Sequence, residues 1–188
     1  MSNTNDRTVQ AVDLFAGIGG SSCGAESAGV RVVAAVDTWD VACEAYADNN
    51  PSVKIYNSLC ERVDPRNIPR DLGTIDLLMA SPECTSHTCA KGAAERSESS
   101  RATAFQVLRF AEALKPKWIA VENVVHMRAW GRFQELIESL ESLGYYCLPQ
   151  VLSSADFGVP QSRRRLFIVC ELGQQPPRIQ ALKESLTA

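Results

Sequence analysis

The chain has 188 residues, of which 45% are hydrophobic, and a formal net charge of −3. This length suits one well-packed domain, and the acidic balance means that any nucleic-acid binding must come from a local basic face. Seven scattered cysteines without a C-x-x-C pair are typical of a reducing compartment. The polar start, Met1–Arg7, lacks the apolar core of a signal peptide, and no apolar run is long enough to span a bilayer. We therefore expect a cytoplasmic protein without a membrane partner.

Short β-branched runs alternate with amphipathic stretches, which is the pattern of βαβ units around a parallel sheet. The expected strands are Thr8–Phe15, Arg31–Asp37, Val53–Tyr56, Ile75–Ala80, Lys117–Asn123, Tyr145–Leu152 and Arg165–Cys170. Apolar residues at helical spacing predict one helix around Val107–Leu114 and another around Phe133–Leu140, with Gly144 as its C-cap. Pro149 predicts that the sixth strand lies at an edge of the sheet or carries a bulge.

We expect three parts along the chain: a disordered tail over residues 1–7, one α/β domain over 8–172, and a linker or tail over 173–188. The second boundary depends on Gly173–Pro177, whose glycine, glutamine and proline content is typical of a linker. A polar loop, Glu83–Ser100, interrupts the alternating pattern. Its length indicates a functional or mobile segment.

A glycine-rich turn, Asp13–Gly20, leads from the first expected strand into a helix. Glycines there permit a tight turn and let the backbone approach a bound nucleotide or nucleoside. The dinucleotide fingerprint G-x-G-x-x-G is nearly met, but Ser22 stands in place of the third glycine. Asp37 ends the second strand, where a carboxylate binds ribose hydroxyls. We therefore expect a nucleoside-containing cofactor, with NAD as an open alternative.

Cys84 lies just after the expected strand Ile75–Ala80, at the edge where open α/β sheets place their chemistry. Most free cysteines are small buried side chains, but this one follows Pro82 closely and opens the polar loop, which favours a nucleophile. Cys84, His87 and Cys89 have no evident fourth ligand, so we expect no metal site.

Two further motifs should reach the same edge. Glu122 follows a neighbouring strand, and a carboxyl group beside a thiol can share a proton with a ring nitrogen of a heteroaromatic substrate. In the segment Gly158–Arg165, Arg163 and Arg165 should share one face of the last strand while Arg164 points away. Two guanidinium groups at this edge suit a phosphate or a base carbonyl.

In this order, the motifs resemble those of the DNA (cytosine-5) methyltransferases, which use S-adenosylmethionine. Asp13–Gly20 is similar to their first cofactor motif, Asp37 to their ribose-binding acidic residue, and Cys84 to the nucleophile of their Pro-Cys motif. Glu122 is similar to the glutamate of their Glu-Asn-Val motif, and Gln161–Arg165 to their Gln-x-Arg-x-Arg motif. The resemblance covers residues 8–172 and implies an α/β, Rossmann-like methyltransferase fold: a mostly parallel seven-stranded sheet with helices on both faces.

The resemblance also implies which residues form the site. The catalytic residues would be Cys84, Glu122, Arg163 and Arg165. The residues that would bind S-adenosylmethionine are Asp13, Phe15, Ala16, Gly17, Gly19, Gly20, Asp37, Thr38, Ser58, Leu59 and Pro82. Asn123, Gln161 and Arg101 would contact the substrate, and no metal is implied.

The implied reaction is methyl transfer to C5 of a cytosine in double-stranded DNA. The Cys84 thiolate would add to C6 of a flipped-out base, while Glu122 engages N3 and the exocyclic amine so that C5 becomes nucleophilic. Arg165, with Arg163, would hold the cytosine O2 or a neighbouring phosphate. The loop Glu83–Ser100 would close over the base.

The chain departs from the family's pattern at three points. Glu83 precedes the nucleophile where a proline is usual, Ser58 stands where an aspartate meets the adenine amino group, and the target-recognition domain and last two motifs are missing. We therefore expect a second polypeptide or a missing C-terminal segment that carries target recognition. The alternatives are a catalytically idle or partner-dependent subunit of a split methyltransferase, a tRNA cytosine-5 methyltransferase, and an NAD-dependent oxidoreductase, which Ser22 disfavours.

Overall fold

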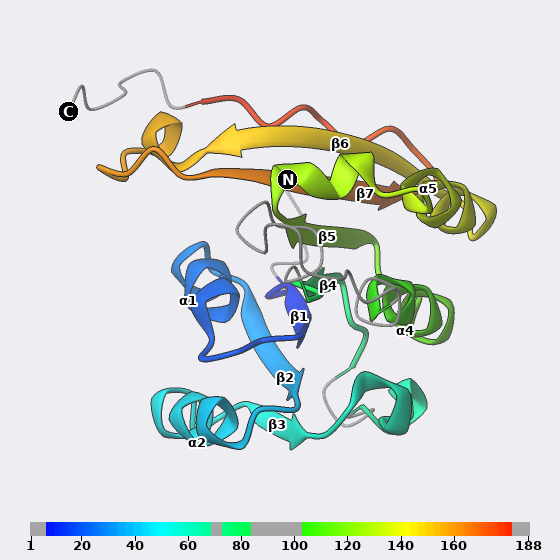
Figure 1. Cartoon of the computed structure of the whole chain (residues 1–188). Coiled ribbons are helices and arrows are strands. Elements are labelled where there is room, and N and C mark those ends of the chain that lie inside the picture. Colours follow the sequence, from blue (N-terminus) through cyan, green and yellow to red (C-terminus); the bar gives the residue numbers. More distant parts are fainter. Residues whose placement is uncertain (1–6, 69–72, 84–102, 182–188) are drawn as a thin grey trace, which may run out of the picture.

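One mixed sheet organises the computed structural model, which describes residues 7–68, 73–83 and 103–181. Its strands are β1 (Gln10–Leu14), β2 (Arg31–Asp37), β3 (Lys54–Asn57), β4 (Leu77–Ala80), β5 (Trp118–Asn123), β6 (Tyr145–Ser153) and β7 (Arg164–Leu172). Within the described ranges they form a seven-stranded sheet in the order β3-β2-β1-β4-β5-β7-β6 (Figure 1). Neighbouring strands pair in parallel except at β7, which is antiparallel to both β5 and β6. The predicted mostly parallel seven-stranded sheet is confirmed.

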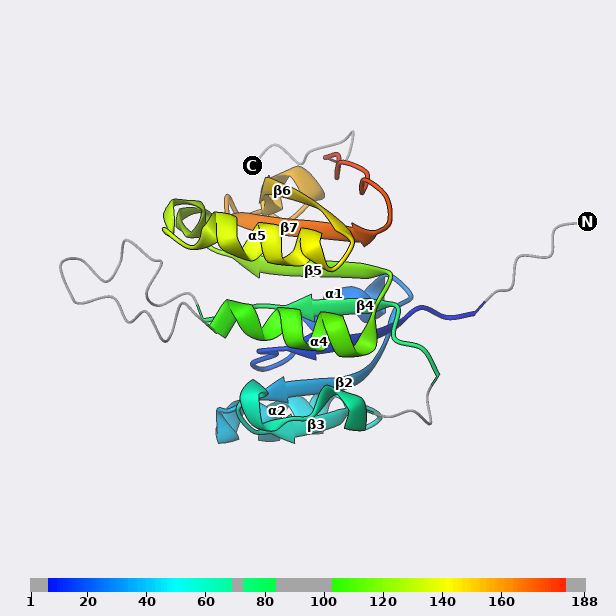
Figure 2. The same ribbon diagram turned by 90° about the vertical axis from the view of Figure 1, so that its right-hand side faces the viewer.

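Helices cover both faces of this sheet, as predicted. Helices α1 (Gly20–Ser27) and α2 (Asp40–Asn49) lie on one face, and α4 (Gln106–Leu114) and α5 (Phe133–Ser142) lie on the other (Figures 1 and 2). The predicted apolar stripes of α4 and α5 face the sheet and are largely buried. Gly144 follows α5 with φ 92°, the left-handed conformation that a C-terminal glycine supplies.

The core has two parts because successive strand residues point to opposite faces. Val12 and Leu14 of β1 pack in the larger cluster, together with the buried side chains of α4 and α5. Ala11 of the same strand packs in the smaller cluster with Tyr46 of α2. The residues of β1 after Gln10 are all buried, as expected for a central parallel strand.

Strand β6 lies at an edge of the sheet, as Pro149 predicted. Chain beyond β7, within the expected linker over 173–188, returns along this strand (Figure 1). The backbone N–H of Ile179 donates to Gln150 Oε1 at 3.0 Å, Gln174 Nε2 donates to Glu171 Oε1 at 2.6 Å, and Pro176 is buried. Residues 173–181 therefore pack against the domain.

Candidate active site

Three cavities adjoin one another at the carboxyl ends of the parallel strands, beside the point between β1 and β4 where the strand order changes direction. Open α/β sheets bind their ligands at this point. The first and second cavities share Phe15 and Ser81 in their walls. The second and third share Glu122, Arg163 and Phe167. Ligands in neighbouring cavities would therefore lie against common side chains.

The first cavity, of about 420 Å³, lies beyond β1, β2 and β3. It is lined by Phe15, Asp37, Thr38, Trp39, Ser58, Leu59, Cys60, Glu61, Ser81, Glu83 and Thr103. Asp37 Oδ2 accepts a hydrogen bond from Gly17 N at 2.8 Å, and its Oδ1 accepts one from Trp39 N at 2.9 Å. The Trp39 side chain is 63% exposed. An exposed aromatic ring next to an oriented carboxylate suits a nucleoside, which offers a base to stack and ribose hydroxyls to bind.

The glycine-rich turn lies between the first and second cavities. Phe15, at the end of β1, has φ 59°, a left-handed conformation that is uncommon for a bulky side chain and often marks a functional site. Gly19 has φ 94°, and a Cβ added there would lie 3.0 Å from the ring of Tyr46. Only glycine fits at this position, so the backbone of the turn lies directly on that ring.

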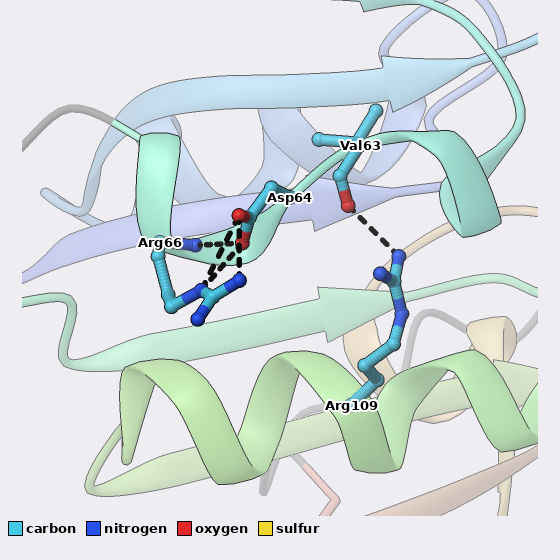
Figure 3. Close-up of polar contacts among 4 residues, drawn as sticks. All are labelled: Val63, Asp64, Arg66 and Arg109. Atoms are coloured by element: carbon cyan, nitrogen blue, oxygen red, sulfur yellow. Dashed lines mark hydrogen bonds and ion pairs between the residues drawn. The ribbon is translucent and has the colours of Figure 1, made fainter.

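A short helical segment, η1 (Cys60–Arg62), forms the far wall of the first cavity and is held from below by α4. Arg109 of α4 donates from Nη2 to the carbonyl oxygen of Val63 at 2.8 Å and also to that of Cys60. Figure 3 shows the contact with Val63, and it shows Arg66 folded back onto its neighbour Asp64. One guanidinium group therefore fixes the wall at both ends of η1.

Replacing Arg109 with methionine should lower the free energy of unfolding by about 2 kcal/mol, because two carbonyl groups lose a charged hydrogen-bond donor while the apolar stem is kept. Chemical denaturation measures the change. Arg66→Met is the matched control, because Arg66 is itself exposed and pairs with Asp64 at the surface, so its loss should alter stability far less. Equal effects of the two substitutions would contradict the anchoring role.

The second cavity, of about 520 Å³, lies on the α1 side of the sheet. Its walls are Phe15, Ala16, Ile18, Gly20, Ser21, Met79, Ala80, Ser81, Ala120, Glu122, Arg163 and Phe167. Ile18 at its rim is 65% exposed. The cavity thus combines backbone N–H groups at the start of α1, an apolar floor from the sheet, and the side chains of Glu122 and Arg163.

The third cavity, of about 340 Å³, is lined by Glu122, Leu152, Ser153, Ser154, Phe157, Val159, Arg163, Arg165, Phe167 and Ile179. Here Arg165 Nε lies 3.1 Å from Glu122 Oε1, so β5 and β7 bring the two predicted catalytic residues into an ion pair. Arg163 lines the second and third cavities, whereas Arg164 lines neither, which matches the predicted alternation. Burial raises the pKa of the Glu122 carboxyl, and the charges of Arg165 and Arg163 oppose that rise.

Asn123, predicted to contact the substrate, lies elsewhere. Its side chain is 2% exposed, its Nδ2 donates to the carbonyl of Pro82 at 3.0 Å, and its Oδ1 accepts from Val124 N at 2.8 Å. Both ends of the amide are therefore used internally, and Asn123 ties the end of β5 to the segment after β4. Pro82, predicted to bind the cofactor, is buried at this contact and lines none of the three cavities.

Of the other predicted cofactor residues, those that line the first or second cavity are Phe15, Ala16, Gly20, Asp37, Thr38, Ser58 and Leu59. Gly17 and Gly19 shape the turn and line none of the three cavities. Asp13 is fully buried beneath it. Gln161 is exposed in the tight turn before β7 and also lines none of the three. Cys84 and Arg101 lie outside the described residues.

Several lining residues were not predicted. Trp39 carried a usable signal, because a tryptophan two residues after an aspartate that is predicted to bind ribose is well placed to stack on a base. Glu61, Ser81 and Phe167 carried none, since they reach the cavities only through the tertiary fold.

Across the described ranges, no group of three or more His, Cys, Asp or Glu side chains is placed to hold a metal ion. Each helix in the same ranges is too short or too polar to cross a membrane.

Comparison with known proteins places this geometry in a family. Residues 9–187 match the model of the C-5 cytosine-specific DNA methylases. The chain is 32% identical over 172 residues to the type II methyltransferase M.HindV of Haemophilus influenzae, covering 89% of this chain and 54% of that protein. It is 35% identical over 170 residues to M.Bsp6I of Bacillus sp., covering 86% and 51% respectively.

Solved structures agree at the level of the fold. The S. pombe Dnmt2 methyltransferase superposes with a TM-score of 0.72 at 22% identity, covering 92% of this chain and 52% of that one. The chain spans about half the length of the curated relatives it matches. With the family model matching nearly all of its length, this chain belongs to the C-5 cytosine-specific DNA methylases.

Proposed function

We propose that this chain is the catalytic region of an S-adenosylmethionine-dependent DNA (cytosine-5) methyltransferase, and that a further segment or partner completes it. The observation that carries the proposal is the continuity of the three cavities, which brings the Asp37–Trp39 turn, the glycine-rich turn and the Glu122–Arg165 pair to one edge. Cys84, the proposed nucleophile, follows Pro82 at that edge by two residues. A cytoplasmic location is part of the proposal.

The described residues fit S-adenosylmethionine. The first cavity would hold the nucleoside, with Trp39 against the adenine and Asp37 on the ribose hydroxyls. Backbone N–H groups around Gly20 and Ser21, at the start of α1, would attract the carboxylate of the amino-acid part in the second cavity. The bound cofactor supplies an electrophilic methyl group on a sulfonium.

The chain's own residues would supply the remaining chemistry. Cys84 would add as a thiolate to C6 of the cytosine, placing the electron pair on C5, which then takes the methyl group. Glu122, whose pKa is raised by burial, would carry a proton to the N3 side of the ring and hold the exocyclic amine. Water would take the C5 proton, N3 would return its proton to Glu122, and departure of the Cys84 thiolate would restore the aromatic ring. Arg165 would orient Glu122.

DNA is the proposed substrate, with the target cytosine flipped out of the duplex so that the thiol can reach it. Arg163 is exposed, Arg165 is half-buried, and both line the third cavity, so a local basic face exists at the active edge of a chain with net negative charge. Such a local face suits phosphate groups.

The proposed partner or missing segment would cover the floor of the second cavity. On the α1 side of the sheet, Met79 of β4, Ala120 of β5 and Phe167 of β7 line this open cavity, whereas α4 and α5 cover the opposite face. The relatives' additional length is consistent with a segment that packs there and recognises the target sequence. Supplying that segment in trans and measuring tritiated methyl incorporation tests the proposal.

Replacing Cys84 with alanine should abolish methyl transfer and covalent capture by 5-fluorocytosine DNA, while S-adenosylmethionine binding, measured by calorimetry, stays within about twofold. Fluorine at C5 prevents loss of a proton, so the thiol adduct accumulates in the parent protein. Cys23→Ala is the matched control, because Cys23 is an exposed thiol on α1 that lines none of the three cavities. Capture that survives Cys84→Ala would overturn the nucleophile assignment.

A catalytically idle or partner-dependent subunit is the second candidate, favoured by Glu83, which directly precedes Cys84 in the sequence, is exposed and lines the first cavity. Inactivity with the complementary segment present, together with retained DNA binding, would support the idle form. Activity on tRNA but not on duplex DNA would reassign the substrate. Calorimetry that detects NAD but not S-adenosylmethionine would indicate the oxidoreductase instead.

A further inference from the structure

Three buried polar side chains from three different elements meet beneath the glycine-rich turn. Asp13 comes from β1, Ser22 from α1 and Tyr46 from α2, and each is fully buried. Ser22 Oγ donates to Asp13 Oδ2 at 2.7 Å, and Tyr46 Oη lies 2.7 Å from the same Oγ. Because a serine hydroxyl has one hydrogen, which Asp13 accepts, the tyrosine is the donor in the second contact. The two contacts form one continuous series of hydrogen bonds, from Tyr46 to Ser22 to Asp13.

This chain of hydrogen bonds fixes the start of α1. The N-cap of that helix is Gly19, which has no side chain to accept from the first turn. Asp13 of β1 acts as the acceptor for the first turn instead. Its carboxylate accepts from the hydroxyl of Ser22 and is also stabilised by the backbone N–H of Ser22. A carboxylate below the first turn also opposes the positive end of the helix dipole.

The same hydrogen bonds fix the spacing between the two halves of the proposed cofactor site, the first and second cavities. The ring of Tyr46 supports Gly19, where an added Cβ would approach to 3.0 Å. Tyr46 belongs to α2, the helix that begins directly after the Asp37–Trp39 turn. Ser22 therefore joins the helix after the glycine-rich turn to the helix after the ribose-binding turn.

We propose that Ser22 is a positioning residue for the cofactor, which it serves by joining Asp13 and Tyr46 so that the glycine-rich turn keeps the height and direction needed at the second cavity. This inference rests on the proposed function. It also explains why the third glycine of the dinucleotide fingerprint is replaced: the position holds a buried hydrogen-bonding group. Asp13, predicted to touch the cofactor, belongs to this support below the turn.

The proposal predicts a loss of affinity confined to one part of the ligand. Ser22→Ala should weaken binding of S-adenosylhomocysteine about tenfold, because the N–H groups of the turn that meet its amino-acid part lose their support. Binding of methylthioadenosine, which lacks that part and would occupy mainly the first cavity, should change less than about twofold. Tyr46→Phe, which keeps the supporting ring, should act in the same direction.

Calorimetry with both ligands, well below the melting temperature of each variant, is the test. Ser27→Ala is the matched control, since this serine lies on α1, is exposed and donates to Cys23 O within the helix. Equal losses for the two ligands, or no loss for either in both variants, would overturn the positioning role. Failure of the unmodified chain to bind either ligand would instead count against the proposed function, so the two failures are distinguishable.

Discussion

Replacing Glu122 with glutamine should lower the rate of methyl transfer by at least about 100-fold, the usual contribution of a general acid–base group. Glutamine keeps the size and can still accept a hydrogen bond from Arg165, but it has no proton to give to the cytosine ring. The rate is measured as tritiated methyl incorporation with the complementary segment supplied. Glu112→Gln is the matched control, because Glu112 is exposed on α4.

The pH profile tests the same role independently. Burial raises the pKa of Glu122, so its protonated form persists to higher pH than that of an ordinary glutamate, and the rate should fall as pH rises through the pKa. Arg165 opposes the rise, so Arg165→Met should move the fall to higher pH while lowering the maximum rate. A profile that keeps its position in Arg165→Met would contradict proton donation by Glu122.

The strands were predictable because central parallel strands are buried on both faces and therefore appear as continuous apolar runs. Each predicted strand agrees with the structure to within two residues at either end. The order of the motifs also located the edge where the site lies. The strand bounds follow from local composition, and the edge follows from the rule that parallel strands place their ligand sites at their carboxyl ends. Both can be applied to a single sequence.

The direction of individual side chains was harder to predict. Glu122 and Asn123 are adjacent in β5, so they point to opposite faces: one lines two cavities, and the other binds the carbonyl of Pro82. Because the two residues belong to one motif, the sequence suggested that both face the substrate. Adjacent strand residues point to opposite faces, so only one of them can do so. Contacts such as Arg109 on η1, or Tyr46 on Ser22, join residues far apart in sequence, so no local pattern announces them.

Asp13 and Asp37 illustrate how two carboxylates of one predicted site differ in role. Asp37 has both oxygens held by backbone N–H groups and still faces the first cavity, which suits a ligand. Asp13 is sealed beneath the turn, and its Oδ1 has no hydrogen-bond partner among the described residues. Burying a carboxylate with one oxygen that lacks a hydrogen bond lowers the free energy of unfolding, so ionisation of Asp13 should have a measurable effect on stability.

Burial raises the pKa of Asp13 to about 6 from its ordinary 3.8, with hydrogen bonds from Ser22 opposing the shift and the charge of Asp37 adding to it. A carboxyl group with a raised folded pKa stabilises the fold below its unfolded pKa, and this contribution is lost as pH rises through the folded pKa. The full loss is about 3 kcal/mol, of which about 2 kcal/mol falls between pH 4.5 and 7.5.

The substitution Asp13→Asn removes this ionisation while keeping an oxygen that can accept from Ser22. The free energy of unfolding of the variant, minus that of the parent chain, should therefore rise by about 2 kcal/mol from pH 4.5 to 7.5. The difference isolates Asp13, because other titrating groups, including nearby Asp37 and Tyr46, are common to both proteins. Asp48→Asn, at an exposed position on α2, should show no such rise. If the difference in free energy of unfolding between Asp13→Asn and the parent chain does not change with pH, the Asp13 carboxylate is solvated. Asp13 would then not be a buried charged group that supports the glycine-rich turn.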